Sequence, residues 1–306
     1  MSTSDLHITP GDWVRLLVLS VLWGGSFFFT GVAVREVPPM TIVFLRAGGA
    51  ALLLWPLLSV YRIRIPRTWA GWRPFVVLAL LSNAVPFSLT AIGQTLVSSG
   101  IASVVNAMTP VFTVLVLAAF GEERLLPRRI AGVALGFTGV LILQGFEIDF
   151  RSAQSLGIAL CLAATVCYGF AALWAKRVVA DVPPVGAATF QLASAGAVML
   201  VLTVVFDQPW QLPMPSVSTW LALLGLAGIS TALGFILFFQ IVRGSGAGNV
   251  MLVTLLVPVT AIVLGYFFLH ETITPREIVG ALLICSALLI MDGRILSRFA
   301  TPRASA

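Results

Sequence analysis

The polar residues that could do chemistry in this sequence are few, and they lie inside long apolar segments. Arg46 is the only charged residue well inside such a segment, where an arginine is costly and marks a functional hypothesis. Asn83 and Asn106 each lie one turn before a proline, Pro86 and Pro110. Their amides offer hydrogen bonds to a neutral or zwitterionic molecule. This pattern indicates a binding cavity rather than a reaction centre.

The same residues give little support to an enzyme. His270-Glu271 begins a zincin-like pattern, but no second histidine follows four positions later. The chain has two histidines, His7 and His270, and both lie near segment ends, so a Ser/His/Asp set within the apolar segments is excluded. The three cysteines lack the paired spacing of a disulfide framework or a zinc site. We therefore predict no catalytic residue, no metal site and no cofactor.

Composition predicts an integral membrane protein. The 306 residues are 59% hydrophobic and 10% charged, with a mean hydropathy of +1.03, whereas soluble domains carry about 25% charged residues. The net charge of +6 does not indicate a nucleic-acid partner, because the basic residues are scattered rather than clustered on one face. The expected surroundings are a lipid bilayer.

The apolar segments predict an all-α protein of ten transmembrane helices. A crossing needs about 20 mostly apolar residues, and cutting at charged, proline-rich or glycine-rich positions gives ten segments. The predicted spans are 12–34, 39–60, 73–95, 99–120, 127–146, 154–176, 184–206, 217–241, 247–269 and 275–293. Several have a proline at or near the first helical position, where its missing N–H costs nothing. These are Pro39, Pro74, Pro127, Pro184 and Pro275.

Basic residues predict the orientation. Fourteen of the 18 lysines and arginines fall on the face that holds the N-terminus and every second connection. Three fall on the opposite face: Arg35, Arg151 and Arg276. Since cytoplasmic connections are enriched in lysine and arginine, both termini are expected in the cytoplasm.

The second half of the chain repeats the first. Glu36-Val37-Pro38-Pro39 recurs 145 positions later as Asp181-Val182-Pro183-Pro184, and further along the offset becomes 148. Pairs at the second offset include Ser82 with Ser230, Phe87 with Phe235, Pro110 with Pro258, and Gly132 with Gly280. We predict two five-helix domains, 12–146 and 154–293. Because five is odd, the second copy would be inverted, which is typical of transporters; duplication of some other helical bundle is the alternative.

Helix-breaking residues at matching places in the two halves predict the substrate site. Pro86 corresponds to Gly234, and Pro110 to Pro258. A proline there frees a backbone carbonyl, which in a bilayer must face protein or a cavity. The neighbouring candidates for substrate binding are polar or aromatic. They are Trp23, Asn83, Asn106, Tyr168, Ser230, Thr231 and Thr254. The alternatives are hydrogen bonds between helices for the polar side chains and ordinary packing for Trp23 and Tyr168.

Three charged residues are predicted to be structural or gating residues. Arg46 could hold a substrate carboxylate, pair with carbonyls between helices, or extend toward the membrane surface. Glu123 and Glu271 lie at joints between segments, where a carboxylate suits the free N–H groups at the start of the next helix.

These motifs, in this order, resemble the EamA-type exporters of the drug/metabolite transporter superfamily. The resemblance covers residues 12–292 and rests on several short motifs. They are Trp23-Gly24, Pro39 with Arg46, Thr109-Pro110-Val111-Phe112, Glu123 with Gly132 and Gly139, and the later set Pro258, Glu271 and Gly280. It implies export of small metabolites, amino acids or hydrophobic drug-like compounds, across the bacterial inner membrane. Gln191 stands where the repeat would place a second Arg46, so that charge is not duplicated.

The acidic residues favour facilitated transport. All 12 lie at segment ends or in connections, whereas proton-driven pumps commonly use carboxylates inside the membrane. We predict export of neutral or aromatic amino acids by alternating access, without a proton relay. The alternatives are a multidrug or lipophilic-cation exporter, with or without proton coupling, and a receptor or scaffold. The protein is expected to be a monomer or a homodimer.

Overall fold

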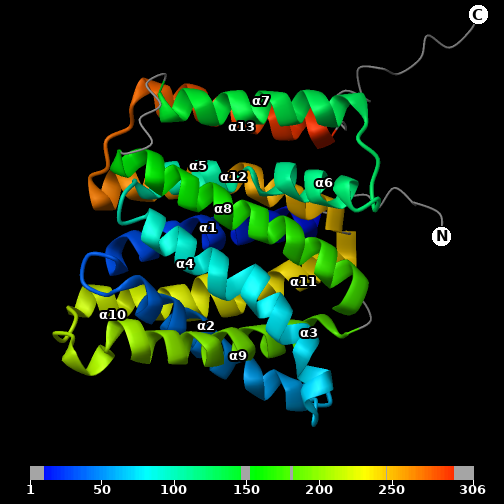
Figure 1. Cartoon of the computed structure of the whole chain (residues 1–306), viewed down its shortest axis with the longest axis vertical. Coiled ribbons are helices and arrows are strands. Elements are labelled where there is room, and N and C mark those ends of the chain that lie inside the picture. The colour runs from blue at the N-terminus through cyan, green and yellow to red at the C-terminus, as the bar shows by residue number, and fades with distance from the viewer. Residues whose placement is uncertain (1–9, 146–151, 180–181, 246, 293–306) are drawn as a thin grey trace, which may run out of the picture.

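The computed structural model describes residues 10–145, 152–179, 182–245 and 247–292, and in these ranges it contains helices and no strands. The long helices lie side by side across the molecule (Figure 1). The first half contains α1 (Pro10–Ala33), α2 (Pro39–Val60), α3 (Trp69–Ala79), α4 (Val85–Gly93), α5 (Ser99–Asn106), α6 (Thr109–Ala119) and α7 (Pro127–Gln144).

The second half contains six further α-helices. They are α8 (Ala153–Trp174), α9 (Pro184–Leu202), α10 (Val217–Leu224), α11 (Gly234–Ser245), α12 (Ala247–Leu269) and α13 (Pro275–Asp292). A short 3₁₀ turn, η4 (Pro209–Gln211), precedes α10. The membrane-spanning character follows from these helices: seven helical segments of the described part are long and apolar enough to cross a bilayer. The count of ten spans stays a prediction. The predicted ends at 146 and 293, and Arg151, lie outside the described residues.

Four helices begin at the prolines that the sequence singled out. Pro39, Pro127, Pro184 and Pro275 are the first residues of α2, α7, α9 and α13, where their fixed φ suits a helix start. The third predicted span is different, because α3 begins at Trp69 and Pro74 lies inside it. The Thr68 hydroxyl accepts a hydrogen bond from the Gly71 N–H at 3.4 Å and caps the earlier start.

π-helical turns interrupt several of the helices. The turns η1 (Leu80–Ala84) and η5 (Gly225–Leu233) join α3 to α4 and α10 to α11, while η2 (Ala175–Val179) and η3 (Thr203–Asp207) extend α8 and α9. At the sequence offset of 148, η1 falls within η5. Such turns are rare in proteins, and those that occur are often found at functional sites, because they depart from the regular hydrogen-bond pattern. The sequence did not predict them.

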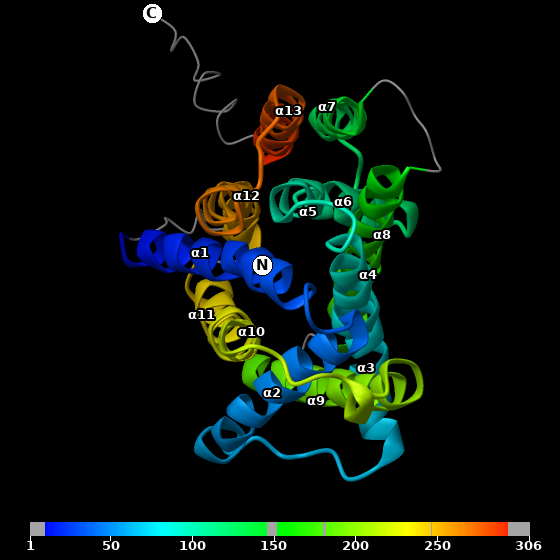
Figure 2. The same cartoon turned by 90° about the vertical axis from the view of Figure 1, so that its left-hand side faces the viewer.

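Corresponding helices of the two halves pack in corresponding ways. α7 packs against α13, α2 against α9, α1 against α12, and α8 against α6; Figure 2 shows α7 and α13 together at one end of the molecule, far from α2 and α9. A Cβ atom on Gly139 would lie 2.9 Å from the Gly280 carbonyl oxygen, and one on Gly280 equally close to that of Gly139. The small residues of α7 therefore bring α7 and α13 into close contact within one chain.

Candidate substrate site

Arg46 connects α2 to the π-helical turn η5. Its Nε–H donates a hydrogen bond of 3.0 Å to the Thr231 hydroxyl, and that hydroxyl donates one of 2.7 Å to the Leu226 carbonyl, five residues earlier. The bond therefore reaches a carbonyl inside an irregular turn, where α-helical pairing is interrupted. Arg46, the charged residue inside the second predicted span, is thus hydrogen-bonded to the second half of the chain.

An aromatic ring lies against the other side of the guanidinium. The Arg46 Cζ atom is 3.6 Å from the ring centroid of Phe87 on α4, a cation–π arrangement that strengthens away from water. Tyr168 of α8 packs into the same cluster as Phe87 and Met199. Residues from α2, α4, α8 and η5 therefore meet around one charge.

Two polar side chains in the π-helical turns are buried without a partner. Asn83 in η1 and Ser230 in η5 are fully buried, and neither the Asn83 amide nor the Ser230 hydroxyl has a hydrogen-bond partner in the described part of the chain. A buried polar group left unpaired costs about 1–3 kcal/mol. Such groups are uncommon in native proteins and require an explanation, and recognition of a ligand is one.

Trp23 of α1 lies against Gly234, the first residue of α11, which directly follows the π-helical turn η5. A Cβ atom on Gly234 would be 2.8 Å from Trp23 Nε1, so only glycine lets the indole approach this backbone. The indole also packs against Phe238, with 5.7 Å between ring centroids. The structure therefore places Trp23 beside α11. It places Tyr168 in the cluster of Phe87, which with Arg46 and Thr231 we call the Arg46 cluster.

The remaining helix-breaking residues are all buried, but they act differently in the two halves. Pro86, Pro110 and Pro258 are buried. Asn106 ends α5 and Pro110 is the second residue of α6, so the fourth predicted span is divided into two helices. Pro258, by contrast, lies inside the continuous helix α12. The Asn106 carbonyl accepts a hydrogen bond of 2.7 Å from the Thr109 hydroxyl. Thr254, half-buried on α12, has the place matching Asn106.

Glu271 and Glu123 make contacts other than those expected. Glu271 accepts hydrogen bonds from the Ser99 N–H at 2.8 Å and the Gly100 N–H at 3.4 Å. It therefore caps α5, which lies far away in the sequence, rather than the helix that follows it. Glu123 forms an ion pair with Arg129. Glu271 differs from the predicted cap because tertiary packing brings the start of α5 close to it, whereas Glu123 does contact the first turn of the next helix, but through the Arg129 side chain rather than through free N–H groups.

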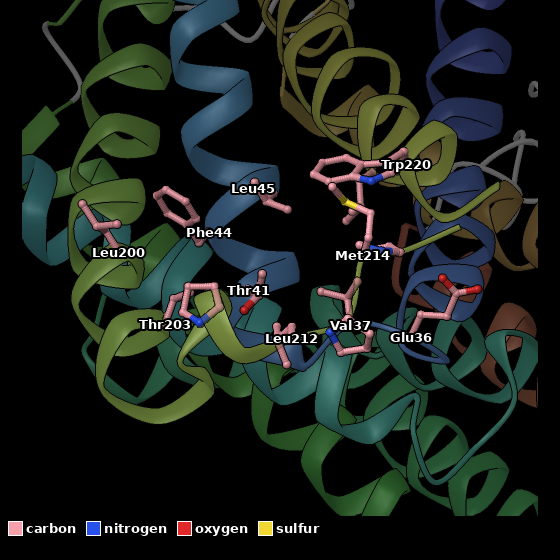
Figure 3. A pocket seen from close by; sticks show the side chains of 14 residues that line it. Glu36, Val37, Thr41, Phe44, Leu45, Leu200, Thr203, Leu212, Met214 and Trp220 are labelled. Carbon is pink, nitrogen blue, oxygen red and sulfur yellow. The ribbon is translucent and has the colours of Figure 1, made fainter. Parts of the chain in front are cut away.

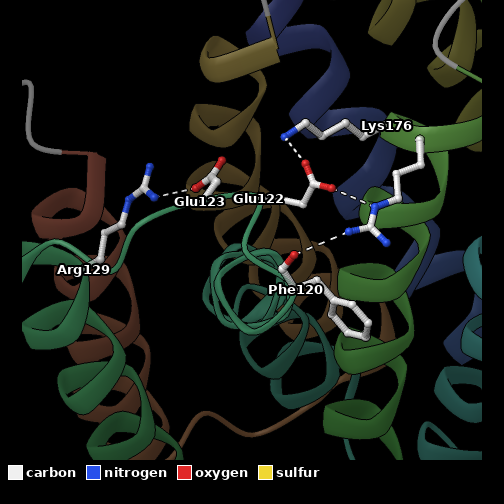
Figure 4. A network of polar contacts seen from close by, with 6 residues as sticks. Phe120, Glu122, Glu123, Arg129 and Lys176 are labelled. Carbon is white, nitrogen blue, oxygen red and sulfur yellow. Dashed lines mark hydrogen bonds and ion pairs between the residues drawn. The ribbon is translucent and has the colours of Figure 1, made fainter.

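Ion pairs of Glu122 connect the residues that follow α6 to η2, the π-helical turn that extends α8 (Figure 4). Glu122 lies 2.9 Å from Lys176 and 2.7 Å from Arg177. Hydrogen bonds from these two basic side chains lower the pKa of the Glu122 carboxyl. The Trp174 indole N–H also donates to the Pro74 carbonyl at 3.0 Å, so the ends of α3, α6 and α8 are held together.

Two cavities lie at opposite ends of the α2–α9 pair. One, of about 340 Å³, is lined by Glu36, Thr41, Phe44 and Trp220 among others (Figure 3). The other, of about 630 Å³, is lined by residues around Arg62 and Phe190. Neither is lined by Trp23, Asn83, Asn106 or Tyr168. The cavity predicted at mid-membrane therefore remains a prediction.

Sequence reasoning overlooked two residues. Phe87 was noted as a repeat match but not as the ring that covers Arg46; its identity with Phe235 across the repeat was the available signal. Asp207 accepts hydrogen bonds of 2.7 Å from both the N–H and the hydroxyl of Thr41. It caps α2 from the far half of the chain, and no local pattern announces such a contact.

Comparison with known proteins gives a consistent result. The model of the EamA-like transporter family matches residues 13–144 and again 155–291. The chain is similar to the uncharacterized transporter YvbV of Bacillus subtilis, at 24% identity over 90% of each chain. It is also similar to a probable amino-acid metabolite efflux pump of Salmonella typhimurium, at 27% identity over 91% of this chain and 94% of that protein.

A third relative and a solved structure extend these findings. The uncharacterized inner membrane transporter YedA of Escherichia coli K12 is 25% identical over 92% of this chain and 90% of its own. A crystal structure covers 94% of this chain and 98% of its own with a TM-score of 0.66 at 20% identity, which shows a shared fold. Together with the apolar helices, these relatives confirm a multi-pass protein of the inner membrane.

Proposed function

The chain belongs to the EamA-like transporter family, and from this premise we propose that it exports small zwitterionic solutes, chiefly neutral and aromatic amino acids. The family is one of membrane transporters, in keeping with a chain that is not an enzyme. Two relatives, from Salmonella typhimurium and Escherichia coli, carry the name probable amino-acid metabolite efflux pump. Those names support the proposed substrate class.

This proposal rests above all on the surroundings of Arg46. Its Nε–H donates to Thr231, its Cζ atom lies over the Phe87 ring, and its terminal nitrogens have no hydrogen-bond partner in the described part of the chain. Arginine presents several N–H donors in a fixed plane, which suits a carboxylate. A half-buried guanidinium beside an aromatic ring therefore suits the two ends of an aromatic amino acid.

We propose that Asn83 and Ser230 complete the site. Their buried, unpaired groups lie in η1 and η5, beside Ala84 and Thr231, which belong to the surroundings of Arg46. An amide oxygen and a hydroxyl can accept hydrogen bonds from a substrate ammonium group. Trp23, Asn106, Tyr168 and Thr254 would form the walls of the same path.

The proposed mechanism is alternating access by two inverted halves, 12–146 and 154–293. The two family matches and the matching pairs of packed helices support this division. Pro86, Pro110, Gly234 and Pro258 would supply the bends that exchange between halves. With no carboxylate in the Arg46 cluster of the described residues, transport would follow the substrate gradient without a proton relay.

The second candidate is export of lipophilic cations. The rings of Trp23 and Phe238 favour it, since aromatic faces attract cations. However, Phe87 is already covered by the Arg46 guanidinium, and that positive charge repels a second cation. We therefore place this candidate behind amino acids.

Uptake into proteoliposomes tests the proposal. Labelled phenylalanine, threonine and a lipophilic cation would each be offered to the full chain, with and without an imposed pH gradient. We expect uptake of the amino acids that does not depend on the pH gradient. Uptake of the cation alone would reject the substrate class, and uphill accumulation driven by the pH gradient would reject the facilitated mechanism.

A further inference from the structure

The connection between α2 and α3 carries a basic cavity that the transport site does not use. We call it the Arg62 pocket; its volume is about 630 Å³, and its lining includes Tyr61, Arg62, Arg64, Phe75, Phe190 and Gln240. The arginines lie at its mouth and are exposed, whereas Phe75 and Phe190 are buried. The pocket therefore combines an apolar interior with a positively charged rim.

The arginines are held on a fixed loop. The Ile63 N–H donates to the Leu58 carbonyl at 2.8 Å, and the Ile63 side chain packs with Phe75 and Phe190. The Trp72 indole N–H donates to the Pro66 carbonyl at 2.9 Å. Arg62 itself adopts a left-handed backbone conformation, φ 53°, which is costly for a residue other than glycine. Arg62 and Arg64 are thus presented by a frame that packing keeps in place.

Among the described residues, no ion pair involves the arginines of the pocket. Neither Arg62 nor Arg64 has a carboxylate within 4 Å among the residues that the structure describes. At the neighbouring ends of α6 and α8, by contrast, Lys176 and Arg177 share the carboxylate of Glu122 (Figure 4). The Arg62 pocket therefore has the charge to hold an anion, and a planar guanidinium suits a phosphate.

The neighbouring exposed side chains favour an anion anchored in the membrane. Tyr61, Ile65 and Trp69 are 60%, 44% and 69% exposed, and they alternate with arginines in the loop between two membrane-crossing helices. Tyrosine and tryptophan concentrate at the level of lipid headgroups, and basic pockets at helix ends bind anionic headgroups. A soluble anion would not need the apolar neighbours.

The cavity at the other end of the α2–α9 pair serves as an internal comparison (Figure 3). Its residues Leu45 and Leu223 have the repeat places of Phe190 and Phe75, so the two cavities share a frame. Its charged lining residue is Glu36, and no lysine or arginine lines it. Of these two cavities, the Arg62 pocket has arginines in its described lining and the other does not, so similar frames carry different chemistry at the two ends.

We propose that the Arg62 pocket binds the phosphate headgroup of an anionic phospholipid from the leaflet at the basic end of the protein. Arg62 and Arg64 hold the phosphate, Tyr61 and Trp69 lie beside the headgroup, and Phe75 and Phe190 face the glycerol and upper acyl segments. The lipid bridges the α2–α3 connection and the start of α9, because both line the pocket.

Native mass spectrometry of the full chain tests this proposal. The purified protein in detergent would be titrated with phosphatidylglycerol or phosphatidylcholine, and the bound fraction would be compared. We expect preferential retention of phosphatidylglycerol and a loss of about tenfold or more in R62Q/R64Q, since each basic residue contributes about 1 kcal/mol to anionic-lipid binding.

The matched control is R124Q/R128Q, which removes two exposed arginines of the α6–α7 joint that also lack a carboxylate within 4 Å in the described ranges. We expect less than about a twofold change in that variant. An equal loss in both variants, or no preference of the wild type for phosphatidylglycerol, would overturn the proposal. Displacement of the lipid by an equal concentration of inorganic phosphate would assign a soluble anion and overturn it too. Elution volume and melting temperature establish that each variant is folded.

Discussion

The two halves of this chain place different chemistry on the same frame. Arg46 on α2 and Gln191 on α9 hold matching repeat positions, and α2 packs against α9. Thr231 and Asn83 also match, in η5 and η1. Arg46 meets a hydroxyl and an aromatic ring, whereas Gln191 is buried and the Asn83 amide has no hydrogen-bond partner in the described part of the chain. The two segments that match the family model thus have similar helices and differ in the charge at the centre.

Such polarity suits a zwitterion. A symmetric pair of arginines would bind two carboxylates and repel an ammonium group, and a symmetric pair of amides would bind neither end strongly. One charged half and one neutral half can hold the two ends of an amino acid in a single orientation. The difference in charge between the two halves would therefore serve substrate recognition. Substitutions that make the two halves alike test this.

Arg46→Gln makes the two halves alike and should have the largest effect. We expect the phenylalanine uptake rate to fall about ten- to a hundredfold, because hydrogen bonds to a charged group contribute about 1.5–3 kcal/mol. Arg46→Lys should recover only part of the rate, since an ammonium lacks the planar donors. Initial rates in proteoliposomes measure this.

The matched control for that change is Gln191→Ala. It removes the amide at the corresponding place of α9 and should change the rate by less than about threefold, because no charge is lost. If Gln191→Ala and Arg46→Gln reduced uptake equally, the polarity of the centre would have no part in recognition.

The second test compares Thr231→Val with Asn83→Ala, at matching positions in η5 and η1. Thr231→Val removes the hydroxyl that accepts from the Arg46 Nε–H, so we expect a loss of about 1–3 kcal/mol of stability. Asn83→Ala removes an amide with no partner and should leave the melting temperature equal or higher while it lowers uptake. Tryptophan fluorescence on heating reports both. A larger destabilisation by Asn83→Ala would show that the amide has a structural partner.

The smallest effect is expected at the connection before α2, where Glu36 matches Asp181 of the second half. Hydrogen bonds from the Ser216 N–H and hydroxyl lower the pKa of the Glu36 carboxyl. A lowered pKa contributes stability above the ordinary glutamate pKa, and this contribution is lost as the pH falls through the lowered value. The wild type should therefore melt slightly above Glu36→Gln at pH 7.

That difference should close as the pH falls through the lowered pKa of Glu36, since protonation makes both side chains neutral. Thermal unfolding of the two proteins across this pH range checks the sign. A difference that stays constant down to pH 3 would show that the interaction depends on shape rather than on the charge of Glu36. Asp181 lies outside the described residues, so its match with Glu36 rests on the sequence alone.

Local chemistry made several helix boundaries predictable. Prolines fix the starts of α2, α7, α9 and α13, because a missing N–H costs nothing in the first turn of a helix and the fixed φ of proline suits its first position. The predicted third span began too late, because Arg73 and Pro74 indicated a boundary there, whereas Thr68 caps a helix that begins at Trp69. The family was also predictable, because its motifs are spread along the entire chain in a fixed order.

The partners of the charged residues could not be predicted from the sequence. Arg46 meets Thr231 across 185 positions, and Glu271 caps α5 across 172; both depend on which helices pack together. The π-helical turns were also missed, since one turn of i→i+5 bonding leaves no distinctive pattern among apolar residues. The candidate site was therefore approximate: its residue types were predicted, but their pairing was not.

The π-helical turns η1 and η5 carry information about history. A turn closed by i→i+5 bonds holds one residue more than an α-helical turn, so a one-residue insertion into an α-helix would produce such a segment. The five residues of η1 correspond, at the offset of 148, to residues inside η5. An insertion inherited once explains this more simply than two independent events at the same place. The ancestral half-length gene would already have carried the irregular turn before it was duplicated, and the turn would be older than the division of labour between the halves.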